Sequence, residues 1–510
     1  MSVRMEAGSL TVRSRAGATI DRRIFGGFLE HVGRAVYSGI YEPGHPTAGP
    51  DGMRRDVIEA VKELGTTLVR YPGGNFVSAY NWEDGVGPVA ERPVRLDPAW
   101  HSLEPNEVGT AEFIAWARTV GAEPMMAVNL GTRGIADAIR LLEYCNASVG
   151  ALADLRRSHG NDEPFGIRSW CLGNEMDGEW QLGHSTAEQY GRLAEQTAHA
   201  MRCLDDSLEL VACGPSGPGV PWFEDWIRQV LRLSYSQVDQ LSCHWYVSED
   251  DVDLTSYLAS GAGMDRYIER AVAIADEVGA ELGTDKRIDL SFDEWNVWNM
   301  RRHQRRDTIS GIGNWPFAPP LLEEEYTLVD AVAAGSLLMS LIGHADRVKV
   351  ACIAQLVNAI APIMTVPGGP VWRQTTFHPF ALSSVLAGGA LLPVELDVPS
   401  IDTEAYGTVP AVQAVAGIND GQACLLLVNR YPDRAISLKM GFEGHDGPLE
   451  VVSLAGEDLH VTNNADHPDR VTPSQRQVAG GDEVVLPPAS WSRVRPLSQP
   501  NRQLQRGNTR

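Results

Sequence analysis

The sequence has no long uninterrupted apolar run. Its most apolar region, residues 331–366, is broken by Asp346, Arg347 and Lys349, so it lacks the roughly 20 consecutive apolar residues that span a bilayer. Residues 1–15 contain three arginines and no apolar stretch long enough for an export signal. We therefore expect a cytoplasmic protein with no membrane partner.

Cysteine is sparse and shows no pairing pattern. The seven cysteines are odd in number and include no C-x-x-C pair, which fits reduced thiols in the cytosol better than a disulfide framework. Several of them end strand-like runs, where a thiol packs as a small apolar group. The seven are Cys145, Cys171, Cys203, Cys213, Cys243, Cys352 and Cys424.

Sequence signatures of cofactor sites are also absent. None of the 13 histidines falls in an H-E-x-x-H pattern, which argues against a zinc site. Gly73 and Gly74 are not followed by the Lys-Ser/Thr pair of a phosphate-binding loop, so we expect them to form a tight turn. The sequence therefore predicts no cofactor and no metal.

Basic residues are in the minority. The chain has 43 Lys and Arg against 66 Asp and Glu, a formal charge of -23, which repels phosphate backbones and anionic lipids. We expect no nucleic-acid partner. Hydrophobic residues at 43% and charged residues at 21% are ordinary for a globular protein with a large core.

Apolar runs that end in polar or glycine residues recur through the first three quarters of the chain. Helix patterns fall between them: one is capped by Ser185 with Glu188 reaching back, and another begins near Thr110 with Glu112 in its first turn and stops at Gly121. The eight runs are residues 23–29, 67–70, 124–129, 169–172, 208–214, 240–244, 289–292 and 347–355.

Eight alternating strand and helix units predict a closed (β/α)8 TIM barrel of the α/β class, with functional side chains at the carboxyl ends of the strands. A doubly wound open sheet is the alternative. Its glycine-rich dinucleotide fingerprint is missing after the first run, which favours the barrel.

After about Ser384 the pattern changes to short strands parted by turn residues, at 424–428, 435–440, 449–454 and 483–486, which predict a C-terminal antiparallel β-sandwich. Leu10 and Val12 lie on one face of an N-terminal strand that can join it. We expect a barrel over 20–384, a sandwich over 385–497 joined by a strand from 1–19, and a polar, frayed tail over 498–510.

Two acids close strand runs at suitable places for glycoside hydrolysis. Glu175 and Glu294 follow runs four and seven and lie 119 positions apart, or about 40 residues for each of three barrel repeats. A retaining glycosidase needs one carboxyl group protonated and a second ionised, roughly 5 Å apart. Arg70 closes run two and can keep one of them ionised, while the other stays protonated in a drier place.

Other side chains near these acids suit a sugar. The Asn174 amide can bind a hydroxyl group, and Trp295 or Trp298 can supply a flat apolar wall. Each of these residues, taken alone, can also have a purely structural role, since a glutamate at a strand end is often a cap or an ion-pair partner. His244 fits either a satisfied strand-end histidine or a place in the cleft.

Several strings together resemble the family-51 α-L-arabinofuranosidases. They include Arg70-Tyr71-Pro72-Gly73-Gly74-Asn75-Phe76, Cys171-Leu172-Gly173-Asn174-Glu175-Met176-Asp177-Gly178 and Asp293-Glu294-Trp295-Asn296. Further matching strings are residues 27–37, 80–85 and 353–358, so the resemblance extends from near residue 20 to near 380. It implies a retaining (β/α)8-barrel hydrolase with its acid on strand four, its nucleophile on strand seven and a β-sandwich after the barrel.

The resemblance also implies roles for single residues. Glu175 matches the general acid/base and Glu294 the nucleophile. Residues that match those holding the arabinofuranosyl ring, or forming its aromatic walls, are Glu30, Asn75, Asn174, Tyr246 and Gln355, and Trp100 and Trp298. We add Arg70 and His244 to the predicted substrate site.

Two segments depart from the family pattern, the arginine-rich residues 301–307 and His378, where an aromatic residue is expected. Both are expected to touch the leaving-group side.

The predicted function is that of an exo-acting α-L-arabinofuranosidase, which removes terminal arabinose from arabinan or arabinoxylan fragments by double displacement. By resemblance the enzyme is expected to form homo-oligomers, often hexamers. The alternatives are an endo-β-1,4-glucanase or β-xylosidase on the same scaffold, and a catalytically inert sugar-binding protein.

Overall fold

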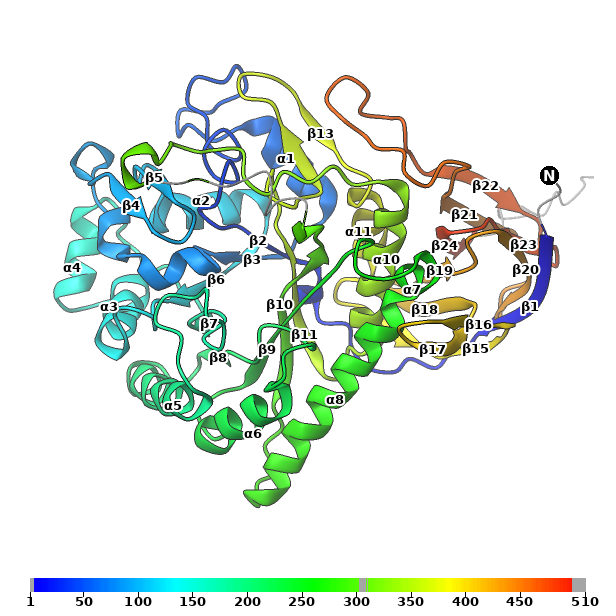
Figure 1. Cartoon of the computed structure of the whole chain (residues 1–510), viewed down its shortest axis with the longest axis horizontal. Helices are drawn as coiled ribbons and strands as arrows, with labels where there is room; N and C mark the ends of the chain where they lie inside the picture. Colours follow the sequence, from blue (N-terminus) through cyan, green and yellow to red (C-terminus); the bar gives the residue numbers. More distant parts are fainter. Residues whose placement is uncertain (1–3, 302–308, 310, 498–510) are drawn as a thin grey trace, which may run out of the picture.

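The computed structural model describes residues 4–301, 309 and 311–497 (Figure 1). The predicted frayed tail, and all of the segment 301–307 except Arg301, lie outside these residues. A barrel with its helices occupies one side of the molecule and a body of β-strands the other (Figure 1). None of the helices in the described ranges is long and apolar enough to cross a bilayer.

Eight parallel strands close the barrel, each hydrogen-bonded to two neighbours. The predicted barrel is therefore confirmed, and the open doubly wound sheet is wrong. The strands are β2 (Gly26–Phe28), β3 (Leu68–Tyr71), β6 (Glu123–Val128), β7 (Ser169–Leu172), β8 (Glu209–Ala212), β9 (Gln240–Val247), β10 (Asp289–Val297) and β11 (Val348–Ala354).

Helices surround the barrel because their apolar faces pack on the outside of the strands (Figure 1). Small and medium side chains, such as Ala127, Cys171 and Val211, fill the interior. The main helices are α1 (Arg55–Leu64), α2 (Thr110–Val120), α3 (Ile135–Asn146), α4 (Ala151–Ser158), α5 (Ala187–Leu204), α6 (Phe223–Ser234), α7 (Leu254–Leu258), α8 (Ser260–Glu281), α10 (Leu328–Gly343) and α11 (Phe377–Ser383).

Local hydrogen bonds correct two sequence predictions. The first run begins as a 3-10 helix, Arg22–Phe25, because the Asp21 side chain accepts from the Arg23 amide, and only the residues after it form a strand. Helix α5 is capped by Thr186 and Gln189 rather than by the preceding Ser185 and Glu188.

The second helix pattern matches its prediction more closely. The Glu112 side chain accepts from the Gly109 amide at the start of α2. Gly121 ends the helix in the left-handed conformation, with a φ of 85°.

The C-terminal strands form a four-stranded and a six-stranded sheet, in the orders β15-β1-β20-β23 and β14-β18-β19-β24-β21-β22. Most pairs are antiparallel, but β1 runs parallel to β20. The strands are β1 (Arg4–Val12), β14 (Ala390–Leu392), β15 (Val394–Asp397), β18 (Val412–Asn419), β19 (Gln422–Asn429), β20 (Arg434–Phe442), β21 (Leu449–Leu454), β22 (Ser474–Val478), β23 (Val484–Leu486) and β24 (Ser490–Pro496).

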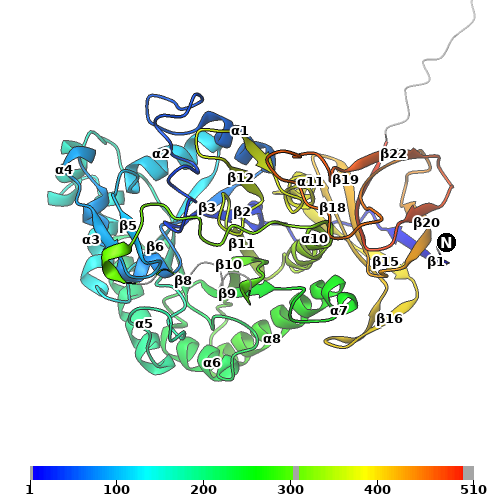
Figure 2. The same cartoon turned by 45° about the horizontal axis from the view of Figure 1, so that its top comes forward.

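Helix α10 joins the two parts of the molecule, since it packs between the barrel and strands β18, β19 and β24 (Figure 2). The Gln413 amide on β18 donates to the Ser336 carbonyl and the Ser340 hydroxyl on α10. Gly335 lets the fully buried ring of Trp491 approach this helix, because a Cβ atom there would lie 2.5 Å from the indole. The barrel, helix α10 and the facing side of the six-stranded sheet therefore share one core, while a second core lies between the two sheets of the sandwich.

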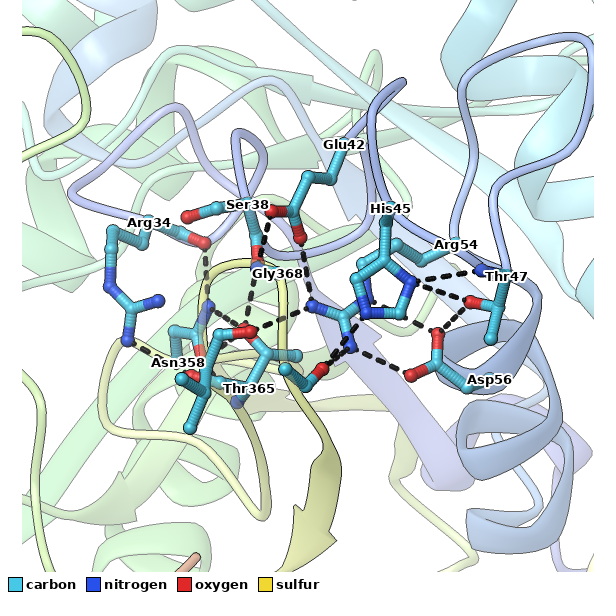
Figure 3. A network of polar contacts seen from close by, with 12 residues as sticks. Arg34, Ser38, Glu42, His45, Thr47, Arg54, Asp56, Asn358, Thr365 and Gly368 are labelled. Atoms are coloured by element: carbon cyan, nitrogen blue, oxygen red, sulfur yellow. Dashed lines mark hydrogen bonds and ion pairs between the residues drawn. The ribbon is translucent and has the colours of Figure 1, made fainter.

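A buried ionic network fixes the long loop after β2 against the hairpin of β12 (Ile363–Thr365) and β13 (Val371–Arg373) (Figure 3). Its centre is Arg54, which is fully buried. The guanidinium lies 2.9 Å from Glu42 and 2.7 Å from Asp56, and it donates to two hairpin carbonyls. This network supports the loop that begins with Glu30.

Candidate active site

A cavity of about 610 Å³ opens at the carboxyl ends of the barrel strands. Its walls come from residues at or just after β2, β3, β7, β8, β9, β10 and β11 and from the loop between β4 (Arg95–Asp97) and β5 (Ser102–Glu104). Barrel enzymes carry their active sites at this end.

Glu294 enters the cavity from β10, and its carboxylate is held by two donors. Arg70 on β3 donates from Nη1 to Oε1 at 2.8 Å. The Tyr246 hydroxyl on β9 donates to Oε2 at 2.8 Å. Burial and the charge of Glu294 raise the pKa of Tyr246 well above its usual range, so the phenol keeps the proton that it donates. Both oxygens of the Glu294 carboxyl group therefore accept a hydrogen bond from a side-chain donor.

Glu175 follows β7 at a sharp turn. Gly173 and Glu175 both have left-handed backbone, with φ values of 90° and 42°. One carboxylate oxygen, Oε1, lies 2.9 Å from Nδ1 of His244, and the other accepts from the Trp180 indole at 2.7 Å.

The surroundings of Glu175 differ from those of Glu294. Burial and the nearby charge of Glu294 raise the pKa of Glu175, against the opposing hydrogen bonds of His244 and Trp180. A raised pKa keeps a carboxyl group protonated and available as a proton donor.

The two acids face each other across a short gap. An oxygen of Glu175, an oxygen of Glu294 and a ring nitrogen of His244 all lie within 4.8 Å of one another. Carboxyl groups this close match the separation of roughly 5–5.5 Å in retaining glycosidases, and inverting enzymes need at least about 6.5 Å. Arg70 already supplies the compensating charge that a metal ion would bring to these side chains.

Glu30 forms a second polar cluster at the cavity wall. Its carboxylate accepts from the Phe76 amide, the Trp100 indole and the Gln355 amide at 2.9, 2.9 and 3.0 Å. Burial outweighs these hydrogen bonds and raises the pKa of Glu30 to about 8. A Cβ at Gly74 would lie 2.6 Å from this carboxylate, so this glycine serves close approach as well as a turn.

The eleven predicted site residues divide into two groups. Three of them, Arg70, Asn174 and His244, do not line the cavity. They lie behind it and are at most 2% exposed, and Arg70 and His244 contact the two acids directly. Those that line the cavity are Glu30, Asn75, Trp100, Glu175, Tyr246, Glu294, Trp298 and Gln355.

The sequence analysis missed residues that contact the acids or their partners, among them Trp180, Asp293 and Ser242, whose hydroxyl lies 3.2 Å from His244. Trp180 is 56% exposed at the mouth of the cavity, and a tryptophan five residues after a candidate acid was the available signal. Asp293 is fully buried next to the Glu294 position, and its carboxylate lies 3.2 Å from Nε of Arg70.

His378, by contrast, lies in helix α11 and does not line the cavity, so its expected place on the leaving-group side is wrong. Helix α11 packs against α10 and α1, which the sequence pattern around this residue did not reveal.

Comparisons with known proteins agree with this geometry. Residues 60–260 match the model of the α-L-arabinofuranosidase 1 domain, and residues 293–490 match that of the α-L-arabinofuranosidase C-terminal domain. An intracellular exo-α-(1→5)-L-arabinofuranosidase from Streptomyces lividans is 51% identical, over 93% of this chain and 73% of the relative. The chain belongs to the family-51 α-L-arabinofuranosidases.

Other members of the family are similarly close. An exo-α-(1→6)-L-arabinofuranosidase from Bifidobacterium longum is 48% identical, over 94% of both chains. The solved structure of a family 51 α-L-arabinofuranosidase from the same organism superposes with a TM-score of 0.92 at 43% identity, over 96% of this chain and 99% of that one. The predicted family, fold and enzyme class are thereby confirmed: this arabinofuranosidase is a glycoside hydrolase.

Proposed function

We propose that this enzyme removes terminal non-reducing α-L-arabinofuranosyl residues by a retaining double displacement, with Glu294 as the nucleophile and Glu175 as the general acid/base. The observation that carries the proposal is the pair of facing carboxyl groups with opposite surroundings. Glu294 has a guanidinium and a phenol as donors, whereas Glu175 contacts an imidazole and an indole and has a raised pKa.

In the first step, Glu294 attacks the anomeric carbon as the bond to the leaving oxygen breaks. That oxygen keeps the bonding electron pair and takes the proton of Glu175. In the second step, Glu175 takes a proton from water, and the water oxygen displaces Glu294 from the anomeric carbon. Configuration is inverted twice and so retained.

Polar atoms around Glu30 suit the hydroxyl groups of one terminal ring. Glu30, Gln355 and Asn75 offer a carboxylate and two amides, and Trp100 and Trp298 offer flat apolar surfaces. The curated relatives act from chain ends on (1→5) or (1→6) linkages, which supports exo action on fragments of arabinan or arabinoxylan. Neither an endo-glucanase, a β-xylosidase nor an inert binding protein is favoured by these relatives.

We further propose a cytoplasmic, homo-oligomeric enzyme, a hexamer by its family resemblance, that releases arabinose for sugar metabolism. All seven cysteines are free, and six of them are buried, as expected for a reducing compartment. The Streptomyces relative is named intracellular. Light scattering on the purified protein measures the oligomeric state directly, and a monomer would contradict it.

Replacement of the nucleophile tests the mechanism. We expect Glu294→Ala to lower kcat on an aryl α-L-arabinofuranoside by at least about 10⁴-fold, because no covalent intermediate can form. Added azide should restore part of the turnover and give a glycosyl azide of inverted configuration, identified by NMR.

Tyr257→Phe is the control, because this buried phenol donates to Asp330 and neither residue lines the cavity. It should keep the turnover of the unchanged enzyme. An active Glu294→Ala enzyme, or rescue with retention, would overturn the assignment.

A further inference from the structure

Asp293 is a fully buried acid that the proposed mechanism does not use. A register shift in β10, between Ser291 and Glu294, adds one residue relative to β9. In a regular strand, neighbouring side chains point to opposite faces, but a bulge lets both turn inward. Asp293 therefore faces the barrel interior beside Cys171, at 3.4 Å, while Glu294 reaches the cavity.

Asp293 is connected to the general acid by a chain of hydrogen bonds. The Ser242 hydroxyl donates to Oδ1 of Asp293 at 2.6 Å. A hydroxyl has one hydrogen, so the Ser242 oxygen can only accept from Nε2 of His244, at 3.2 Å. Oδ1 of Asp293 itself lies 3.6 Å from the same nitrogen. These contacts require a hydrogen on Nε2.

The other ring nitrogen, Nδ1, faces both catalytic acids. It lies 2.9 Å from Oε1 of Glu175 and 3.6 Å from Oε2 of Glu294. With Nε2 protonated, a hydrogen on Nδ1 makes the ring a cation that donates to Oε1 of Glu175. The proton that Glu175 exchanges with substrate is then confined to Oε2, which retains a lone pair for the Trp180 indole.

The buried charges around His244 balance only when Asp293 is counted. Glu175 and Glu294 face the ring from one side, and Asp293 from the other. Arg70 lies beyond Asp293 and Glu294, with Nε 3.2 Å from the former and Nη1 2.8 Å from the latter. Two cations, Arg70 and His244, thus offset two anions, and Glu175 can stay neutral.

We propose that Asp293, acting through Ser242, is a positioning residue for proton transfer, which holds His244 as a cation with Nδ1 on Oε1 of Glu175. Loss of this support would leave a neutral ring, whose Nδ1 accepts the Glu175 proton and draws it away from the leaving oxygen. This inference rests on the proposed acid/base role of Glu175. It predicts a defect that depends on how much proton assistance the leaving group needs.

Leaving groups of different acidity test the proposal. We expect Asp293→Asn to lower kcat/KM at least 100-fold on an α-(1→5)-arabinobiose, whose leaving sugar needs a proton, but less than 10-fold on 4-nitrophenyl α-L-arabinofuranoside. Ser242→Ala should show the same selectivity with a smaller loss, about 10-fold on arabinobiose. The alkaline limb of the kcat/KM profile should move to higher pH, because Glu175 loses a cationic partner that lowers its pKa.

Ser291→Ala is the matched control. Ser291 is a fully buried serine on the same strand, paired with Ser242 across the ladder, and its hydroxyl has no hydrogen-bond partner among the described residues. It should leave both substrates and the pH profile unchanged.

Equal losses on both substrates, with an unmoved pH profile, would overturn the proposal and make Asp293 a merely structural residue. Should Asp293→Asn fail to fold, Ser242→Ala decides between the same two outcomes. The Glu175→Ala variant distinguishes a failure of the Asp293 inference from a failure of the proposed function. If it shows no leaving-group selectivity, the acid/base assignment itself is wrong.

Discussion

At the scale of residues, three glutamates share one cavity and differ because their neighbours differ. Glu294 faces a guanidinium and a phenol, and Glu175 faces an imidazole and an indole. Glu30 accepts three N–H donors yet is so buried that its pKa rises to about 8. Burial thus raises the pKa of both Glu30 and Glu175, whereas Glu294 is held by two hydrogen-bond donors.

The raised pKa of Glu30 predicts a pH-dependent loss of stability. A carboxyl group whose pKa rises from 4.5 to about 8 on folding binds more protons in the folded state. The free energy of unfolding therefore falls as the pH rises through this window, by about 1.4 kcal/mol per unit of pKa change and a few kcal/mol in total. Urea unfolding of Glu30→Gln between pH 5 and 8 should lack this decline.

The exposed Glu59, replaced by glutamine, is the control and should retain the slope of the unchanged protein. Parallel slopes for the protein and for Glu30→Gln would contradict the raised pKa.

The sequence pointed to the two acids because each ends an apolar strand run. It could not place Asp293, since a strand period of two sends neighbours to opposite faces and nothing in the string revealed the bulge. Arg70 and His244 were predicted in the substrate site, but they do not line the cavity and contact the two acids from behind it. The sequence therefore predicted which residues gather at the site. It could not predict which of them line the cavity, because that depends on tertiary packing.

At the scale of elements, short barrel strands carry long, ordered loops. Strand β2 has three residues, and the loop after it extends to α1 at Arg55. Apolar periodicity located all eight barrel strands but misjudged the ends where side chains bond the backbone, as Asp21 and Thr186 do. The polar network of the β2 loop has no periodic signal at all, since its partners come from a hairpin over 300 residues away.

This network predicts a strongly destabilised variant. Arg54→Ala leaves Glu42 and Asp56 without their cation in a largely buried place, so we expect a loss of about 3–5 kcal/mol in the free energy of unfolding. Urea denaturation measures it. The KM should also rise, because the loop positions Glu30.

Arg55→Ala is the neighbouring control. The Arg55 side chain is about half exposed and lies 3.7 Å from an exposed Asp51, so its removal should change stability by less than about 1 kcal/mol. Similar losses for both variants would contradict a special role of the buried network.

At the scale of the whole molecule, we expect the barrel and the sandwich to unfold together, because helix α10 and Trp491 belong to one core that lies between them. The change near Ser384 to short strands separated by turn residues indicated a second domain. It gave no sign of a common core, since helix α10 reads as uniformly apolar and its partners on β18 and β24 are distant in the sequence.

Gly335→Ala tests this shared core. The added methyl group would lie 2.5 Å from the Trp491 indole, so we expect a loss of about 1–3 kcal/mol and one calorimetric transition at a lower Tm. Gly343→Ala, at the end of the same helix, meets only Val415 at 3.5 Å and should be neutral or up to about 1 kcal/mol more stable. Two separate transitions would contradict the shared core.

Glu175 has a left-handed backbone conformation that glycine adopts at lower cost, so the proposed proton donor occupies a position where its side chain costs backbone strain. Directed evolution that selects for thermal stability alone would favour glycine at this position and enrich inactive variants. Stability and turnover therefore have opposite requirements at this residue. Selection for thermal stability has to be coupled to an assay of turnover.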